Sequence, residues 1–167
     1  CHDDIELREN PLTFVNRLTE AFAEDDVGFV GAAGTMDLGP TAIWWDQERW
    51  RQKLHRGNVI HLNEKKEEYV TYYGPQGEVA VLDGLFLAAQ PKVLNDVGLQ
   101  KPVYFEGEWD FYDIHYTSQA FLKGYKNKVL ELNILHNSRG ELVGRDSWHK
   151  NRAAFISKTN LPLRIKS

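Results

Sequence analysis

Residues 111–124 read FYDIHYTSQAFLKG, and this stretch decides the fold that we predict. It has the pattern of a helix whose first turn carries Asp113 and whose end is marked by Gly124. The apolar stripe expected to hold this helix against a core consists of Ile114, Phe121 and Leu122. A carboxylate in a first turn is stabilised in its charged form by the helix macrodipole. Asp113 is therefore either a favourable helix-end charge or a rigidly held ionised group of the kind used in active sites.

Further helices are expected on both sides of this one. Asn10 followed by Pro11 predicts a helix start, and Gly98 predicts the end of a short helix over 91–97. A last helix is expected to follow Asp146 or Ser147, either of which can cap it. Residues 34–40 are expected to form a loop.

Runs of β-branched, aromatic and small apolar residues predict the strands between these helices. The expected strands cover 27–33, 58–62, 68–73, 78–83, 85–89 and 126–135. Strands and helices alternate, which predicts an α/β fold with an antiparallel hairpin in the middle of the chain. No repeat or linker interrupts the pattern, so a single domain is expected over residues 1–167.

Composition excludes several classes of protein. The chain has 167 residues, enough for one domain with a core, and its net charge of −4 argues against a sequence-independent nucleic-acid binder. No run of 18 apolar residues predicts a transmembrane helix. The single cysteine, Cys1, excludes an internal disulfide and a cysteine zinc site, and it fits a reducing, cytoplasmic setting.

Four polar clusters stand at predicted element ends. His2, Asp3 and Asp4 form the first. Adjacent carboxylates repel each other unless a cation or a donor group offsets their charge, and oxygen ligands of this kind suit Mg²⁺ or Mn²⁺. The cluster is therefore either a metal site or a solvated loop.

The second cluster is Asp83 with Gly84, inside an apolar run. An aspartate there is costly to bury without a partner, and the glycine allows the close approach of a ligand. A β-bulge with Asp83 bonded to nearby backbone is the alternative. The third cluster is Asp113 with His115 two residues later.

The fourth cluster is His136, followed by Asn137 and Ser138. A histidine that leaves a buried strand binds metal or phosphate, or is a structural histidine with its bonds satisfied. Asp4, Asp83 and His136 are each predicted at carboxyl ends of strands, where open α/β sheets bind ligands, which favours one shared cleft. The remaining histidines, His55, His61 and His149, have no comparable setting.

The order of five motifs resembles that of the family-2-like glycosyltransferases of bacteria. The motifs are CHDDIEL (1–7), VGFVGAAGT (27–35) with WW (44–45), VLDGLFLAAQPKVL (81–94), FYDIHYTSQAFLKGYK (111–126), and LHNSRG (135–140) with SWHKNRAAF (147–155). The resemblance runs over residues 1–159 and implies a GT-A fold, a Rossmann-like mixed sheet flanked by helices. In that family the nucleotide is held mainly by a region before the first motif. The resemblance thus implies that the chain is the C-terminal portion of a catalytic domain, and that it is inactive alone.

The resemblance also implies an activity. A sugar would pass from a nucleotide-diphosphate sugar to an acceptor hydroxyl, on a glycan or another molecule, with inversion and with Mg²⁺ or Mn²⁺. Asp4 matches the last carboxylate of the family's metal-binding motif, His2 its first residue and Asp3 its middle one. His136 matches a histidine that helps to hold the metal or the diphosphate. These enzymes act in the cytoplasm, and association with the inner face of the membrane is compatible with this.

Other positions receive roles from the same resemblance. Asp113 matches the catalytic base, with Tyr112 in place of the usual glutamate, while His115 replaces a common acidic residue and receives no role. The residues implied to bind the substrate are Asp3, Asp83, Gly84, Tyr112, Trp44 and Trp45, the last two in contact with acceptor or donor.

Two other functions are open at this point. A metal-dependent phosphohydrolase would use Asp3, Asp4 and His136, and would release phosphate without an acceptor. A non-catalytic carbohydrate-binding or scaffold half-domain would bind glycans without metal. Its stacking platform would consist of Trp44, Trp45 and Trp50.

Overall fold

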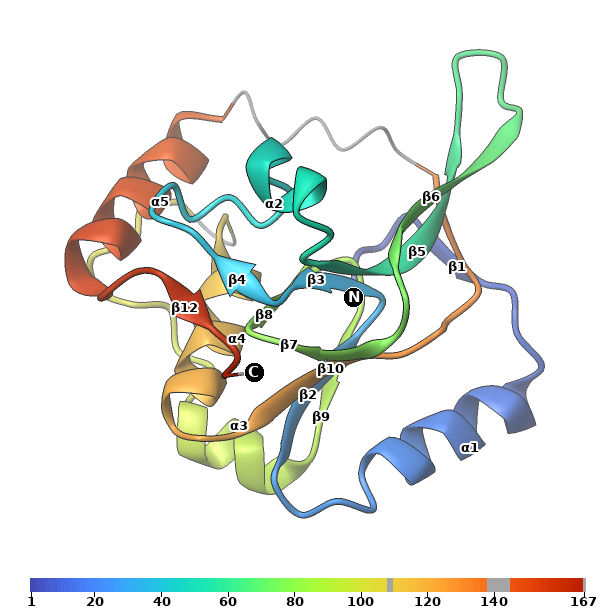
Figure 1. Ribbon diagram of the computed structural model, residues 1–167, viewed down its shortest axis with the longest axis horizontal. Coiled ribbons are helices and arrows are strands. Elements are labelled where there is room, and N and C mark those ends of the chain that lie inside the picture. The colour runs from blue at the N-terminus through green and yellow to red at the C-terminus, as the bar shows by residue number, and fades with distance from the viewer. Residues whose placement is uncertain (108–109, 138–144, 167) are drawn as a thin grey trace.

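The computed structural model describes residues 1–107, 110–137 and 145–166, so Ser138 of the fourth predicted cluster lies outside the described residues. Its helices surround strongly curved sheets, as Figure 1 shows. The helices are α1 (Pro11–Ala21), α2 (Gln47–Arg51), α3 (Pro91–Val97), α4 (Tyr112–Leu122) and α5 (Asp146–Lys158). Helices packed on mixed sheets confirm the α/β class, whereas the GT-A arrangement stays a prediction.

The described strands form a larger sheet, a smaller sheet and a two-stranded ribbon. The larger sheet has the order β1 (Ile5–Leu7), β11 (Ile134–His136), β5 (His55–Leu62), β3 (Ala33–Thr35), β8 (Val81–Leu82), with β6 (Glu68–Gly74) paired to β5. The smaller sheet has the order β7 (Gly77–Val79), β10 (Lys126–Val129), β2 (Val27–Gly31), β9 (Leu87–Ala89). The ribbon joins β12 (Leu163–Arg164) to β4 (Asp37–Leu38). Among these pairs, β11–β5 and β10–β2 are parallel.

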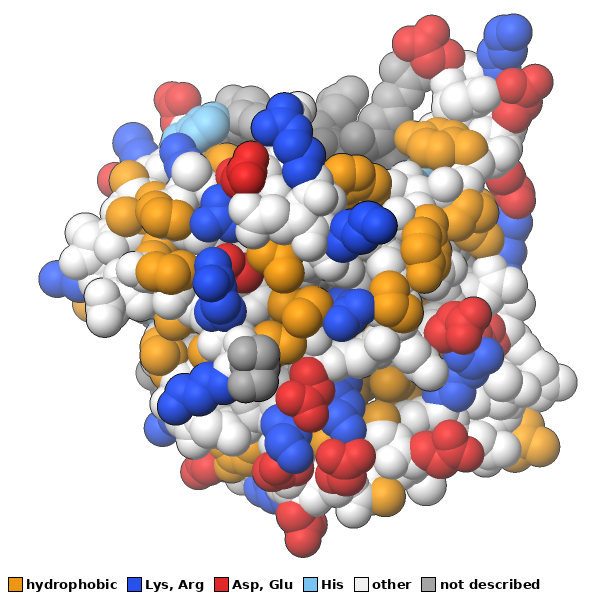
Figure 2. Space-filling view, viewed as in Figure 1, with side chains coloured by type: hydrophobic (Ala, Val, Ile, Leu, Met, Phe, Trp, Pro, Cys, Tyr) orange, Lys and Arg blue, Asp and Glu red, His pale blue; other side chains and the backbone are white. Residues whose placement is uncertain are grey.

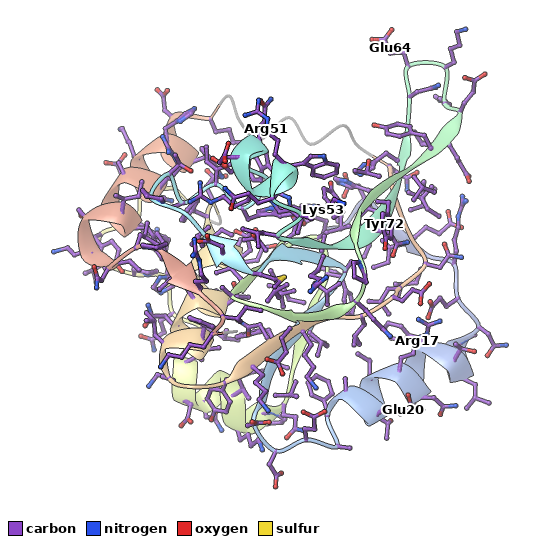
Figure 3. All side chains as sticks on the ribbon, viewed as in Figure 1. Arg17, Glu20, Arg51, Lys53, Glu64 and Tyr72 are labelled. Atoms are coloured by element: carbon purple, nitrogen blue, oxygen red, sulfur yellow. The ribbon has the colours of Figure 1, made fainter. Side chains whose placement is uncertain are left out.

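The strands predicted over 58–62 and 68–73 lie within β5 and β6, which pair antiparallel. This pair extends beyond the body of the molecule at the upper right of Figure 1, and Figure 3 labels Glu64 at its tip. The base of the pair belongs to the larger sheet, where residues 55–57 of β5 pair with β3. Ile60 and His61, nearer the tip, pair with β11.

Local signals fix the ends of two predicted helices, both of which are confirmed. At α1 the Asn10 side chain accepts a hydrogen bond from the Leu12 N–H at 2.9 Å, and Pro11 is the first helical residue. At the end of α3, Gly98 has a φ of 71°, a left-handed conformation that glycine adopts without steric cost.

Polar contacts hold α4 in addition to its buried apolar residues. Ile114 is buried as expected, but Leu122 is 55% exposed, so the stripe was wrong at that position. Thr117 is fully buried and donates from Oγ1 to the Asp113 carbonyl at 2.7 Å. The same hydroxyl accepts from the backbone N–H of Leu82 on β8 at 3.2 Å. The first turn of α4 is thereby tied to the end of β8.

A buried amide then joins α4 to both sheets. Asn127 on β10 donates from Nδ2 to the carbonyls of Ala80, at 2.9 Å, and Thr117, at 2.8 Å. Its Oδ1 accepts from the N–H of Phe29 on β2 at 3.1 Å. Because one side chain satisfies three backbone groups of separate segments, the position of α4 follows from a few buried polar contacts.

Several predicted strands were wrong in extent. The strand over 126–135 is two strands, β10 and β11, which belong to different sheets. The run over 27–33 likewise divides into β2 and β3, and the loop expected over 34–40 contains part of β3 and all of β4. Residues 78–89 hold three short strands, β7, β8 and β9. At each place the chain passes between sheets within a few residues, and the hydrophobic pattern continues through the passage.

The last helix, α5, lacks the predicted side-chain cap. Arg145 occupies the cap position without a capping hydrogen bond, and Asp146 is the first helical residue. The helix is held instead by Trp148 and Phe155, both buried in the largest hydrophobic cluster. None of the helices in the described residues combines the length and hydrophobicity that crossing a lipid bilayer requires.

Candidate functional site

The first part of the site forms where β1 pairs with β11. The two strands are antiparallel, with Ile5 opposite His136, so the residue before β1 meets the end of β11. His136 Nε2 lies 3.4 Å from Asp4 Oδ2, and His2 Nδ1 lies 3.8 Å from Asp4 Oδ1. The rings of His2 and His136 are 5.6 Å apart between centroids. We call His2, Asp4 and His136 the His–Asp–His cluster.

The cluster fits a divalent transition metal ion. Each of its three residues offers one ligand atom, and these atoms lie within 4.8 Å of one another. Two imidazoles and a carboxylate suit Mn²⁺, Fe²⁺ or Zn²⁺ better than Mg²⁺, which prefers oxygen ligands. Burial lowers the pKa of His136, against the opposing effect of the Asp4 carboxylate, and this favours the neutral ring that binds metal. Asp3 is exposed and stands outside this group.

The second part of the site is the turn between β8 and β9. Asp83 Oδ2 accepts a hydrogen bond from Trp44 Nε1 at 2.9 Å, and its Oδ1 accepts from the Leu85 N–H at 2.8 Å. Asp83 therefore makes the hydrogen bond to nearby backbone that is expected of a structural residue. It also makes one to a side chain far away in the sequence. It follows β8 directly, at the carboxyl end of that strand, as predicted.

Gly84 brings this turn against the start of α4. Its N–H donates to Asp113 Oδ2 at 2.9 Å, and its carbonyl accepts from the Tyr112 hydroxyl at 2.9 Å. A Cβ at position 84 would lie 2.5 Å from the Tyr112 oxygen and 3.0 Å from Asp113 Cβ. A side chain would therefore push the turn away from α4, which explains the glycine.

Asp113 is chemically unusual. It keeps some solvent accessibility, yet burial of its carboxyl group and then the negative charge of Asp83 raise its pKa to about 7. The N–H groups of Ile114 and Gly84 act in the opposite direction, since they stabilise the carboxylate. Burial, with the charges of Asp113 and Asp83, also raises the pKa of Tyr112, so its hydroxyl stays protonated.

The two parts of the site are joined. The N–H of His2 donates to the Leu85 carbonyl at 3.0 Å, which ties the His–Asp–His cluster to the turn that carries Asp83. The charge of Asp83 acts to raise the pKa of both Asp113 and His136, so it lies within electrostatic range of both. Asp4 precedes β1 and is thus at the amino end of its strand, contrary to the prediction. The antiparallel pairing still brings it to the carboxyl end of β11.

Aromatic rings form a wall beside Asp83. Trp44 is 4% exposed and lies edge-on to Trp45, which is 39% exposed, with 5.9 Å between ring centroids. His55, fully buried, bonds to the Trp44 carbonyl through Nε2 at 2.5 Å. Tyr73 packs against Trp44 at 5.2 Å. Trp44 thus positions Asp83, while Trp45 presents an open ring.

The sequence model of the glycosyltransferase-like family matches residues 1–158. The chain belongs to that family. Among curated proteins it is similar to the streptomycin biosynthesis protein StrF of Streptomyces griseus, with 29% identity over 108 residues. The match covers 64% of this chain and 34% of StrF, so the chain spans about a third of the curated relative it matches. No solved structure matches it.

The positions of two histidines in this glycosyltransferase-like chain differ from those predicted from the sequence. His61 on β5 is opposite His136 on β11, with 5.7 Å between ring centroids, so it borders the site. Strand alternation predicts that His61 shares a face with His55, and this signal could have identified it. His115 is on the far side of α4 from Asp113, where it lines a hollow with α3 residues such as Leu94 and Val97.

Proposed function

We propose that this chain supplies a metal site and a proton acceptor for glycosyl transfer with inversion, from a nucleotide-diphosphate sugar to an acceptor hydroxyl. Membership of the glycosyltransferase-like family supports the class of reaction. The observation that carries the proposal is Asp113, a carboxyl group with a raised pKa held beside the turn that also contacts the His–Asp–His cluster. StrF, by its name, belongs to an antibiotic biosynthesis route.

Asp113 is the proposed catalytic base. A base works best when its pKa lies near the working pH, and a value of about 7 meets that condition. As the acceptor oxygen forms its bond to the anomeric carbon, its proton passes to Asp113, and the bond from that carbon to the diphosphate breaks. The hydrogen bond from Gly84 N–H to Oδ2 orients the carboxylate.

The leaving diphosphate needs positive charge nearby. His2, Asp4 and His136 would hold a divalent cation, and a bound cation would offset the negative charge that develops on the diphosphate. Two imidazole ligands favour Mn²⁺ over Mg²⁺ in this proposal. Asp3, exposed next to the cluster, would contact the substrate rather than the metal.

The remaining predicted residues have supporting roles in the proposal. Asp83 and Gly84 would line the sugar pocket, with Trp44 and Tyr112 fixing that turn. Trp45 has an accessible ring at the same wall and would contact the acceptor or the donor sugar.

Release of nucleoside diphosphate by the full-length protein, measured for a panel of nucleotide sugars with Mn²⁺ and mixed acceptor glycosides, tests the proposal. Asp113→Asn should retain Mn²⁺-dependent donor binding, measured by thermal shift, and lose turnover at least about 100-fold. His136→Ala should lose both binding and turnover. The matched control is the exposed His149→Ala on α5.

Two outcomes of that assay would contradict the proposal. Near-native turnover of Asp113→Asn would show that another group takes the proton. Release of inorganic phosphate without an acceptor would indicate the phosphohydrolase instead.

A further inference from the structure

A row of side chains crosses the larger sheet from the His–Asp–His cluster to β6. His136 on β11 is in register with His61 on β5, and His61 is in register with Tyr69 on β6. Residues in register point to the same face of a sheet. The ring centroids confirm this, with 5.7 Å from His136 to His61 and 5.5 Å from His61 to Tyr69.

Tyr69 presents an open aromatic surface at the end of this row. Its ring is stacked on His61 with 28° between the planes, and the residue is 50% exposed. The stacking holds the ring in one orientation, so little conformational entropy would be lost when a ligand covers the rest of it.

The row continues into the aromatic wall of the site. Burial lowers the pKa of His61, while the charge of Asp83 acts in the opposite direction. Burial raises the pKa of Tyr73, and the charges of Asp83 and Tyr69 act in the same direction. Tyr73 lies on β6 with Tyr69 and packs against Trp44, which donates a hydrogen bond to Asp83. Ring contacts connect Trp45 through Trp44 to Tyr73, which is four residues along β6 from Tyr69.

We propose that Tyr69, oriented by His61, is a stacking subsite for a sugar ring of the acceptor, one unit or more away from the hydroxyl that reacts. This inference rests on the proposed glycosyl transfer. The apolar C–H face of a sugar carries slight positive charge and stacks on the negative face of an aromatic ring. The acceptor would then be a saccharide of at least two rings.

The distance across the sheet supports an extended acceptor. Neighbouring strands are about 4.8 Å apart, so Tyr69 on β6 lies two strands, or about 10 Å, from His136 on β11. A single sugar ring held beside the His–Asp–His cluster would not reach Tyr69, whereas a second or third unit would.

The open setting of Tyr69 favours a sugar chain over the base of the donor nucleotide. Small flat ligands usually bind in concave sites that cover both faces of the ring. Tyr69 lies instead on the β5–β6 pair that extends into solvent (Figure 1), and it lines neither of the two hollows beside α1 and α3.

The same strand offers a matched control. Tyr72, three residues after Tyr69 and 63% exposed, points to the opposite face because strand side chains alternate. It is visible on the near side of β6 in Figure 3, where Figure 2 shows hydrophobic side chains at the surface. Tyr72 shares the exposure of Tyr69 and lacks the contact with His61.

Tyrosine ring NMR of the full chain provides the test. The probes are mono-, di- and trisaccharides of glucose, galactose and N-acetylglucosamine, with UDP, GDP and ADP in separate samples. Tyr69→Ala and Tyr72→Ala assign the two ring signals. We expect a di- or trisaccharide to shift the Tyr69 signal and leave that of Tyr72 unchanged. Tyr69→Ala should weaken that binding about five- to tenfold, Tyr69→Phe and Tyr72→Ala less than about twofold.

Three results would overturn the subsite. They are no saccharide response at Tyr69, a response to nucleotides alone, or equal losses in Tyr69→Ala and Tyr72→Ala. The titrations are repeated in EDTA and with His136→Ala, because stacking does not require metal. If the native chain does not bind Mn²⁺ and its Tyr69 signal still responds to saccharides, the proposed transfer is contradicted and the subsite is retained. If the native chain binds Mn²⁺ and saccharides do not shift the Tyr69 signal, only the subsite is contradicted.

Discussion

Asp113 owes its properties to its burial and to Asp83 and Gly84 rather than to its helix position alone. A first-turn carboxylate is normally stabilised in its charged form, which would lower its pKa. Burial and the charge of Asp83 outweigh that effect. Gly84 supplies a backbone donor that helps to orient the carboxylate. The balance leaves a group that can both accept and release a proton near neutral pH.

The pH dependence of turnover should follow this balance. Because the base must be ionised, kcat/KM should rise with pH to a midpoint near the pKa of about 7 of Asp113. Asp83→Asn removes the nearby negative charge and should lower the midpoint by about one unit. Asp25→Asn, at an exposed position far along the chain, serves as the control. An unchanged midpoint in Asp83→Asn would contradict the coupling between the two carboxyl groups.

Asp113 should also cost stability at high pH. Its pKa is higher in the folded protein than in the unfolded chain, so its stabilising effect is complete below the unfolded pKa and is lost as pH rises through about 7. Asp113→Asn avoids that loss. Its free energy of unfolding, relative to that of the native chain in urea denaturation, should gain about 3 kcal/mol between pH 4.5 and pH 8. A difference that does not change with pH would exclude a buried, raised carboxyl group.

At the scale of elements, the sequence predicted the helix ends that are fixed by residues close together in the chain. Asn10 and Pro11 fix the start of α1, and Gly98 fixes the end of α3, because capping involves residues within one turn. The division of 126–135 into β10 and β11 escaped prediction, since the partner strands of each half decide it. Asn127, whose three bonds reach distant backbone, gave no signal in the sequence.

Asn127→Ala tests how strongly α4 depends on that amide. The change leaves two buried carbonyls and one buried N–H without their partner, and each unsatisfied group costs about 1 kcal/mol or more. We expect a loss of about 3 kcal/mol in the free energy of unfolding by urea denaturation. Asn16→Ala, on the exposed face of α1, should change it by less than about 0.5 kcal/mol. Similar values for both variants would show that the amide does not organise the fold.

At the scale of the whole molecule, pairing of distant segments assembles the site. The motifs identified Asp4, His136, Asp83 and Asp113 as candidates, and the structure brings them to one region. His61 was missed because its role depends on β11 lying next to β5, a parallel pairing that the sequence does not show. The link from Trp44 to Asp83 spans 39 residues and was equally invisible.

Metal binding should stabilise the whole fold, because the His–Asp–His cluster joins β1 to β11. A ligand that binds the folded state at 100 times its Kd adds about 2.7 kcal/mol. Mn²⁺ should therefore raise the Tm of the native chain and of His149→Ala, and Mg²⁺ should raise it less. His136→Ala should show no such rise. Equal effects of Mn²⁺ on the native chain and on His136→Ala would place the metal elsewhere.

Paramagnetic broadening by Mn²⁺ tests most directly whether the cluster and Asp113 share one space. Bound at His2, Asp4 and His136, the ion should broaden the amide signals of Gly84 and Asp113 strongly. Signals at the far end of α4, at Lys123 and Gly124, should be affected much less, and His136→Ala should abolish the difference. Equal broadening at both ends of α4, or none at Gly84 and Asp113, would show that metal and base do not face each other.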